Sequence, residues 1–283
     1  MDLGLRGRAA IVTGASGGIG GATARLVAAE GAALLLVGRR REALRKVARA
    51  CTEAGAGAVS VLAVDLTGPE AAERVVDAAT DGLGRLDVLV NAAGASGARP
   101  LQELSDADWQ EQWELNVMAP MRLMRAAAPV MAAGGWGRIV NVSSSAGKRP
   151  SGSLDMPYSV AKAGMLSLSR AFADLYAGQG VLVNAVAPGP VDGELWLAPG
   201  GLADQLAARA GTGASPSPSR SQSQSQSQSR EEVLAATAAR VPLGRMGREQ
   251  EVAAVIAFLC SEAAANVVGA AWSVDGGAVP GII

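Results

Sequence analysis

The stretch RAAIVTGASGGIG (residues 8–20) decides the fold of this 283-residue chain. Its first part, 8–13, is a short apolar run that ends in glycines, as a buried parallel strand does. An alanine-rich amphipathic stretch at 21–30 then predicts a helix. In this order of strand, glycine loop and helix, backbone N–H groups can approach a pyrophosphate, and the helix N-terminus adds a partial positive charge. A flexible glycine turn is the alternative, but the strand that follows favours dinucleotide binding.

Strands and helices alternate along most of the chain. Apolar runs predict six further strands, at 33–37, 59–64, 86–90, 138–142, 181–186 and 270–274. Amphipathic segments predict helices at 41–54, 69–82, about 107–132, about 157–178 and 249–261. Pro120 marks a kink or a joint within the long helix at 107–132. The predicted fold is therefore α/β, a three-layer doubly wound (Rossmann) fold with a seven-stranded, mostly parallel sheet.

The pattern changes after the sixth strand. Residues 193–211 predict one or two short helices. The serine–glutamine repeat at 214–229 is almost free of apolar groups, so it cannot bury enough surface to offset the entropy of ordering. We expect a single domain over 1–283 that contains a disordered low-complexity segment at about 212–230.

Composition limits the class of protein. Hydrophobic residues make up 49% of the chain and charged residues 18%, which is enough for a sizeable core. The 25 basic and 26 acidic residues nearly balance, so no basic excess indicates nucleic acid or an anionic membrane as a partner. Cys51 and Cys260 form no CxxC pattern, and no metal site is predicted. The start shows no signal peptide and no apolar run reaches about 20 residues, so a soluble cytoplasmic protein is expected.

Tyr158 and Lys162 are the candidate chemical groups. They are four residues apart and lie on one helix face. An ammonium beside a phenol lowers the pKa of the phenol, and such a tyrosine can exchange a proton with a carbonyl or alcohol oxygen. The chain has no histidine to do this work. A surface tyrosine beside a solvated lysine is the alternative for so short a motif, and the glycine loop favours the catalytic interpretation.

The end of the second strand bears on the cofactor. In dinucleotide folds this position meets the adenosine ribose, where an acid binds the 2′-hydroxyl and an arginine accommodates a 2′-phosphate. Gly38 stands where the acid would be, and Arg39 and Arg40 follow. NADP(H) is therefore favoured, and NAD(H) remains the alternative.

By these motifs the chain resembles the short-chain dehydrogenase/reductase (SDR) superfamily, in its single-domain, oxoacyl-reductase-like branch. The resemblance runs from about Leu5 to Gly277 and rests on TGASGGIG at 13–20, NAAG at 91–94, the Tyr158–Lys162 pair, Pro188-Gly189 and the final DGG at 275–277. It implies a catalytic set of Asn116, Ser144, Tyr158 and Lys162. It also implies a substrate lid at about 193–211 and a homotetramer, with a dimer as the alternative.

The resemblance assigns roles to these residues. Tyr158 exchanges the proton, Lys162 also binds the nicotinamide ribose, Ser144 orients the carbonyl oxygen, and Asn116 holds a water that links Lys162 to solvent. Counting back from Tyr158 would select Ser145, but the loop at 146–157 can absorb an extra residue more easily than a strand can. The expected cofactor contacts are Gly14, Ser16, Gly17, Gly18, Ile19, Gly20, Arg39, Arg40, Asp65, Leu66, Asn91, Ala92, Ala93, Gly94, Tyr158, Lys162, Pro188, Gly189 and Val191.

The expected reaction is hydride transfer between NADP(H) and a small-molecule ketone or secondary alcohol. Ser144, Leu154, Tyr158 and Trp196 are the expected substrate contacts, and the mainly apolar loops around them suit a moderately hydrophobic substrate. Two alternatives remain: an NAD-dependent alcohol dehydrogenase of the same fold, or a non-catalytic protein that senses a dinucleotide. A sensor would be expected to lack part of the catalytic set.

Overall fold

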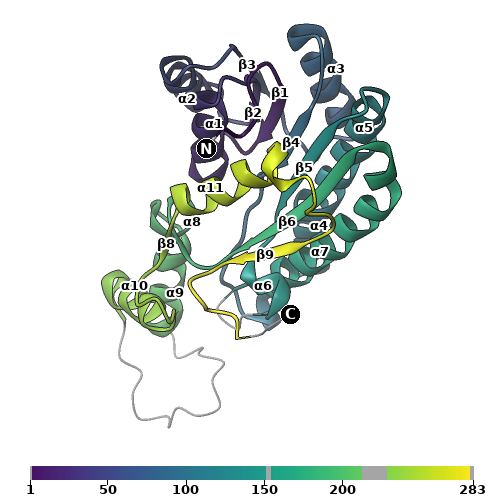
Figure 1. Ribbon diagram of the computed structural model, residues 1–283. Helices are drawn as coiled ribbons and strands as arrows, with labels where there is room; N and C mark the ends of the chain where they lie inside the picture. Colours follow the sequence, from purple (N-terminus) through teal and green to yellow (C-terminus); the bar gives the residue numbers. More distant parts are fainter. Residues whose placement is uncertain (1, 151–153, 212–227, 281–283) are drawn as a thin grey trace.

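Seven parallel strands form the central sheet of the computed structural model, which describes residues 2–150, 154–211 and 228–280 (Figure 1). The strand order is β3-β2-β1-β4-β5-β6-β9. Their bounds are β1 (Ala9–Thr13), β2 (Ala33–Gly38), β3 (Ala58–Ala63), β4 (Val88–Asn91), β5 (Gly137–Val142), β6 (Val181–Pro188) and β9 (Ala271–Val274). The predicted doubly wound fold is confirmed. The order reverses between β1 and β4, which is where folds of this type bind ligands.

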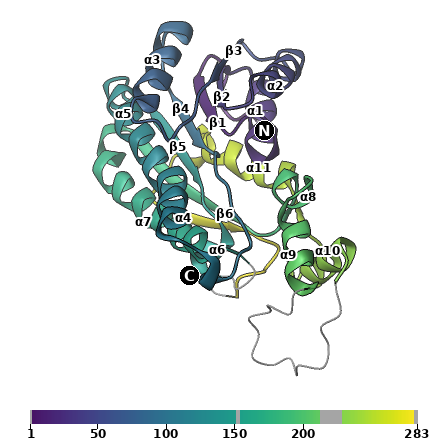
Figure 2. The same ribbon diagram turned by 180° about the vertical axis from the view of Figure 1, so that it is seen from behind.

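Alternate residues of β1 point to opposite helix layers. Ala10 and Val12 pack in a core with α1 (Gly18–Ala29), α2 (Arg41–Ala54) and α11 (Glu249–Leu259). Ile11 packs in the other core, with α3 (Ala71–Leu83), α5 (Ala119–Ala133) and α7 (Met156–Tyr176). The two views show these layers on either side of the sheet (Figures 1 and 2). Because both faces are covered, the central strands are continuous apolar runs.

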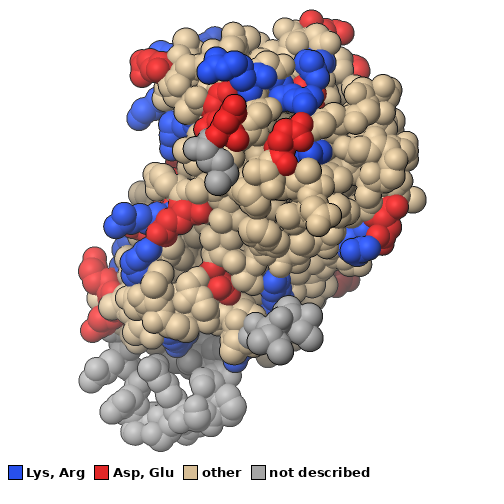
Figure 3. Space-filling model, in the orientation of Figure 1, with Lys and Arg blue, Asp and Glu red and all other residues tan. Residues whose placement is uncertain are grey.

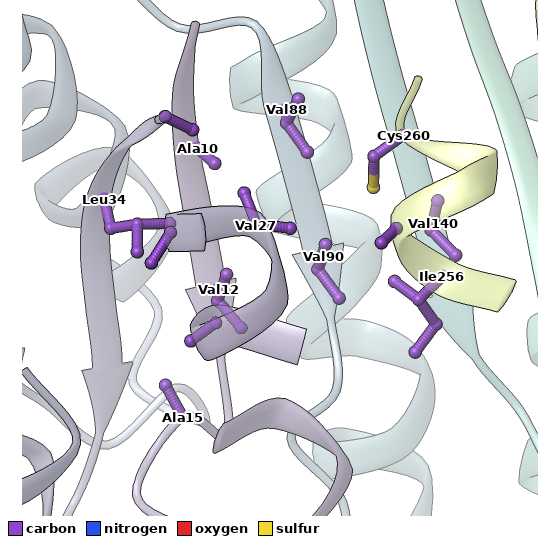
Figure 4. Packing of buried hydrophobic residues seen from close by; sticks show 14 of the residues in the cluster. Ala10, Val12, Ala15, Val27, Leu34, Val88, Val90, Val140, Ile256 and Cys260 are labelled. Carbon is purple, nitrogen blue, oxygen red and sulfur yellow. The ribbon is translucent and has the colours of Figure 1, made fainter. Parts of the chain in front are cut away.

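The first core shows how the glycine-loop helix is anchored. Val27 of α1 and Ile256 of α11 lie against Val12, Val90 and Val140 of three neighbouring strands (Figure 4). All five side chains are essentially inaccessible to solvent. This packing holds the N-terminus of α1 at the carboxyl end of β1.

The predicted long helix at 107–132 is interrupted, which corrects the sequence prediction. The structure has α4 (Asp106–Trp113), a π-helical turn η2 (Glu114–Met118) and then α5. The Ala119 N–H bonds the Glu114 carbonyl, five residues back, where an α-helix would use the residue four back. Pro120 has no N–H to offer the Asn116 carbonyl, so the regular pattern cannot continue there. The wide turn carries Asn116.

A smaller cap covers the carboxyl ends of the strands. It contains α8 (Glu194–Leu197), α9 (Leu202–Gly211), α10 (Arg230–Ala239) and a two-stranded parallel sheet of β7 (Val191–Asp192) and β8 (Gly247–Arg248). The two helices α8 and α9 agree with the short helices predicted at 193–211. Of the segment expected to be disordered at 212–230, residues 212–227 lie outside the described residues. Ser229 caps α10 in a reciprocal capping box with Glu232.

Short helical segments complete the described chain. They are η1 (Leu101–Glu103), α6 (Ser145–Lys148), η3 (Ala177–Gln179) and η4 (Glu262–Ala264). In the described part of the chain, no helix is both long and apolar enough to cross a membrane.

Candidate active site

The four predicted catalytic residues meet at the carboxyl ends of β4 and β5. Tyr158 and Lys162 share one face of α7, and the Lys162 Nζ lies 5.6 Å from the centre of the Tyr158 ring. Ser144 follows β5 and its side chain hydrogen-bonds the Tyr158 side chain. Gly94 follows β4, and a Cβ placed there would lie 3.0 Å from Asn116 Oδ1 and 3.3 Å from Lys162 Nζ. Gly94 therefore lets the asparagine and the lysine approach each other.

Three contacts position Lys162. Its Nζ donates to the Val142 carbonyl at 2.9 Å, and its own carbonyl accepts from the Ser143 hydroxyl at 2.7 Å. A Cβ at Gly147 would come within 2.7 Å of the Lys162 carbonyl carbon, so α6 packs directly on this turn of α7. Burial lowers the pKa of the Lys162 ammonium to about 8. The ammonium is still mostly protonated at neutral pH.

The Tyr158 phenol differs from the sequence prediction. We expected the lysine to lower its pKa, but burial raises the pKa of Tyr158, and the hydrogen bond with Ser144 only partly offsets this effect. Only 7% of the residue is exposed, so loss of hydration outweighs the attraction of an ammonium that is itself desolvated. The side chain is therefore a neutral phenol at physiological pH, which is the state of a proton donor.

The local geometry favours Ser144 over its neighbours in the three-serine run. Ser143 uses its hydroxyl to bind the Lys162 carbonyl, and Ser145 is the first residue of α6. Ser144 has extended backbone, accepts a hydrogen bond from the Ala146 N–H at 3.1 Å and contacts the tyrosine. Of the three hydroxyls, this one lies beside the phenol.

Asn116 presents an unpaired oxygen to the site. Its Nδ2 donates to the Gln112 side-chain oxygen at 2.9 Å and the Gln112 carbonyl at 3.1 Å, and more weakly to Ala95. Its Oδ1 is buried and has no hydrogen-bond partner among the described residues. A buried acceptor of this kind is costly unless a water or ligand satisfies it. The atom faces the side of the site where Lys162 lies.

At two positions of the glycine loop the neighbouring backbone is so close that only glycine fits. Gly14 has φ +65°, and a Cβ there would lie 2.7 Å from the Ala92 carbonyl oxygen. A Cβ on Gly20 would lie 2.5 Å from the Gly14 oxygen. Thr13 Oγ1 accepts from the N–H groups of Ala92 and Ala93, at 3.1 and 3.2 Å. The loop therefore forms a glycine-rich cradle at the N-terminus of α1, which fits a dinucleotide pyrophosphate.

Arg40, which is predicted to bind the adenosine end of the cofactor, lies beside this loop. Arg40 Nη2 contacts the Ser16 hydroxyl at 3.3 Å. Hydrogen bonds from Thr67 lower the pKa of the Asp65 carboxyl, and Arg39 lowers it further. Leu66 is 7% exposed and packs in the core of the α3 layer.

The other predicted contacts lie at the end of β6 and in the cap. The Gly189 N–H bonds the Val274 carbonyl at 3.2 Å, next to Pro188, and Val191 begins the small sheet. Trp196 is 8% exposed and forms a small core with Ala98 and Leu202, against which Leu154 packs.

Several residues that shape the site were not foreseen from the sequence. The buried Asp155 accepts a hydrogen bond from the Arg99 N–H, and Gln205 Oε1 accepts one from the Ala98 N–H at 2.9 Å. Arg209 donates to the Ala98 carbonyl at 2.7 Å. These contacts fasten the loop that follows β4 to α7 and to the cap. They join residues 56 to 111 positions apart, and no local pattern signals them.

The fold and the glycine loop define a doubly wound α/β protein of the dinucleotide-binding type. Comparisons with known proteins identify the family within this class. The family model for short chain dehydrogenases matches residues 8–198, and that for enoyl-(acyl carrier protein) reductase matches 212–279. Cis-4-hydroxycyclohexanecarboxylate dehydrogenase of Sinomonas cyclohexanicum is 41% identical, over 95% of this chain and 96% of the relative. The 3-oxoacyl-[acyl-carrier-protein] reductase of Vibrio cholerae is 32% identical, over 97% and 98%.

A solved structure agrees with these relatives. L-sorbose reductase from Gluconobacter frateurii, complexed with NADPH and L-sorbose, superposes with a TM-score of 0.86 at 33% identity, covering all of both chains. The chain belongs to the short-chain dehydrogenase/reductase superfamily, in its oxoacyl-reductase-like branch. It is an NAD(P)-dependent oxidoreductase that acts on CH–OH or C=O groups of small molecules.

Burial of Lys162 makes stability depend on pH. The pKa of this lysine is about 8 in the folded protein and about 10.4 in an unfolded chain, so between these values the unfolded state binds more protons. The free energy of unfolding should therefore rise with pH across this window. Relative to Lys162→Met, the wild type should gain about 2 kcal/mol between pH 7 and pH 10, as measured by urea unfolding.

The exposed Lys46 on α2 offers a matched control. The pH dependence of unfolding for Lys46→Met should follow that of the wild type. A difference between the wild type and Lys162→Met that stays constant with pH would contradict the buried charge.

Proposed function

We propose that this protein transfers a hydride between NADP(H) and a ketone or secondary alcohol through Ser144, Tyr158, Lys162 and Asn116. One observation carries the proposal: a buried Tyr158 hydroxyl, bonded to Ser144 and next to Lys162, lies at the strand ends that also carry the glycine cradle. A non-catalytic dinucleotide sensor would have no need for this set of side chains at that place.

The chain's own residues handle the oxygen and the proton. The bound nicotinamide supplies hydride to the substrate carbon in reduction and accepts it in oxidation. In reduction the neutral Tyr158 hydroxyl donates its proton to the substrate oxygen, while the Ser144 hydroxyl holds that oxygen by a hydrogen bond. The Lys162 ammonium stabilises the phenolate that remains. The free Asn116 Oδ1 suits a water through which the proton is replaced from solvent.

The cofactor is assigned to the cradle at the ends of β1 and β4. Backbone of Gly14, Gly17, Gly18 and Gly20 would hold the pyrophosphate, and the remaining predicted contacts would hold the nucleosides. Tyr158 and Lys162 would hold the nicotinamide end, together with residues 91–94 and Val191. At the adenosine end, Gly38 has no acid to repel a 2′-phosphate, and Arg39 and Arg40 supply positive charge.

The substrate is proposed to be a moderately apolar ketone or secondary alcohol. Leu154 and Trp196 contribute to an apolar cluster at the cap, with Ala98 of the loop that follows β4. Arg99 pairs with Asp108 at 2.8 Å and with the buried Asp155 at 3.4 Å, so its charge is already compensated. A relative named for the alcohol cis-4-hydroxycyclohexanecarboxylate supports a secondary alcohol as the reacting group.

The first test removes the proposed proton donor. Tyr158→Phe deletes one oxygen atom and should lower the turnover number at least 100-fold with the best substrate from a panel of ketones and alcohols. The dissociation constant for NADPH, measured by fluorescence titration, should change less than threefold. The chain's other tyrosine, on the same helix, provides the control Tyr176→Phe, which should keep wild-type turnover. Substantial activity in Tyr158→Phe would contradict the mechanism.

The second test concerns the cofactor. The wild type should bind NADPH more tightly than NADH by calorimetry, because only NADPH carries the 2′-phosphate that Arg39 and Arg40 can pair with. Arg39→Gln and Arg40→Gln should each reduce this preference. Equal or tighter binding of NADH by the wild type would reject the assignment.

A homotetramer is proposed from two separate exposed apolar regions. On α4 and α7, Trp113 and Val160 are each 43% exposed and line one cavity, and Met156, at the start of α7, is 45% exposed. On the edge strand β9, Trp272 is 37% exposed, and Figure 3 shows mainly uncharged side chains across the middle of that face. Contiguous apolar surface of this kind indicates contact between chains. Two such regions suit a tetramer with two kinds of interface.

Light scattering tests this assembly. At micromolar concentration the wild type should have the mass of a tetramer, and Val160→Glu should have a lower mass because it places a charge in the α4–α7 region. Leu175→Glu changes a 66% exposed leucine on the same helix outside that region, so it should leave the mass unchanged. A monomer mass for the wild type would refute the proposal.

A further inference from the structure

A carboxylate from the cap lies against the glycine loop. Glu194 is the first residue of α8, and its Oε2 lies 2.6 Å from Arg40 Nη2. Its Oε1 lies 2.9 Å from the position that a Cβ on Gly17 would take. Gly17 precedes the first residue of α1, so the absence of a side chain there makes room for the carboxylate.

The position of Glu194 has a simple electrostatic explanation. The start of α1 carries unpaired N–H groups and a partial positive charge, and Arg40 adds a full positive charge beside it. The carboxylate is attracted to both. A dinucleotide would present phosphate groups to the same positive groups, so Glu194 and the cofactor are competitors for one region of the surface.

The surroundings add negative charge to this region. Burial raises the pKa of the Glu249 carboxyl, with the nearby Glu194 and Asp192 also raising it and Arg25 opposing them. The Glu194 N–H also donates a hydrogen bond to Glu249. Among the described residues, Arg40 is the only cation that forms an ion pair with Glu194.

We propose that Glu194 is a specificity-determining residue for the cofactor, because it competes with the 2′-phosphate for Arg40 and so lowers the affinity for NADP(H) relative to NAD(H). This inference rests on the proposed function. NADP(H) must break the Arg40–Glu194 pair before Arg40 can bind the 2′-phosphate, whereas NAD(H) has no such group to offer. Loss of the carboxylate should therefore favour NADP(H) selectively.

The expected effect is moderate. Arg40 and Glu194 are 58% and 55% exposed, and ion pairs of this exposure contribute little because water screens them. We expect removal of the competition to strengthen NADPH binding about fivefold, which corresponds to about 1 kcal/mol.

The test compares Glu194→Gln with the wild type by calorimetry at low salt, with four ligands. NADPH and NADH report on whole cofactors. The fragments 2′,5′-ADP and 5′-AMP differ only in the 2′-phosphate and lack the pyrophosphate. Glu194→Gln should gain about fivefold more affinity for NADPH than for NADH, and about fivefold more for 2′,5′-ADP than for 5′-AMP. Added salt should reduce the gain.

Two further variants locate the effect. In an Arg40→Gln background, Glu194→Gln should give no selective gain, because the shared partner is gone. Glu73→Gln is the matched control: Glu73 is 54% exposed and pairs with Arg125 on the distant α3–α5 surface, so all four affinities should stay unchanged. Thermal unfolding of each variant verifies that the fold is intact.

The outcomes separate the inference from the function on which it rests. Equal gains for NADPH and NADH would show that Glu194 only repels the pyrophosphate and would overturn the inference. Unchanged affinities, or a selective gain for NADPH that persists without Arg40, would overturn it as well. If a folded wild type bound neither NADPH nor NADH, the proposed function itself would fail, and the inference with it.

Discussion

Burial of the Lys162 ammonium is the constraint on which the rest of the active site depends. A charge that is 3% exposed needs polar partners, and the Val142 carbonyl at the end of β5 provides one. The position of the lysine then requires Gly94 and Gly147, since a side chain at either place would meet Lys162. The ends of β4 and β5 and the first turns of α7 are thereby fixed relative to one another.

The same constraint explains the electrostatic state of the pair. Desolvation disfavours the charged form of both groups, so it raises the pKa of Tyr158 and lowers that of Lys162. Proximity of a lysine is therefore insufficient to make a phenolate when both side chains lose their hydration together. In the mechanism that we propose, the neutral phenol is the proton donor in reduction, and the ammonium stabilises the phenolate once the proton has left.

The sequence was sufficient for features with a local signal. Strand positions followed from apolar runs, the glycine cradle from its place between a strand and a helix, and the pairing of Tyr158 with Lys162 from their spacing. Pro120 marked the joint in the long helix, but the π-turn at Glu114–Met118 was missed. A π-turn depends on contacts in the folded protein, and a sequence pattern does not contain these contacts. The direction of the Tyr158 pKa shift also depended on three-dimensional burial.

Contacts between distant segments form the part that no sequence pattern predicts. Glu194 and Arg40 are 154 positions apart, and each alone resembles an ordinary surface charge. Glu194 lies two residues before Trp196, whose side chain is buried in the small core of the cap with Ala98 and Leu202. The cap is therefore attached to the loop that follows β4 on one side and to the glycine loop on the other. Because α8 is a single short turn, a change at Arg40 acts on the same segment that supports Trp196. The Arg40–Glu194 ion pair and the packing of Trp196 in the cap are physically linked through this turn.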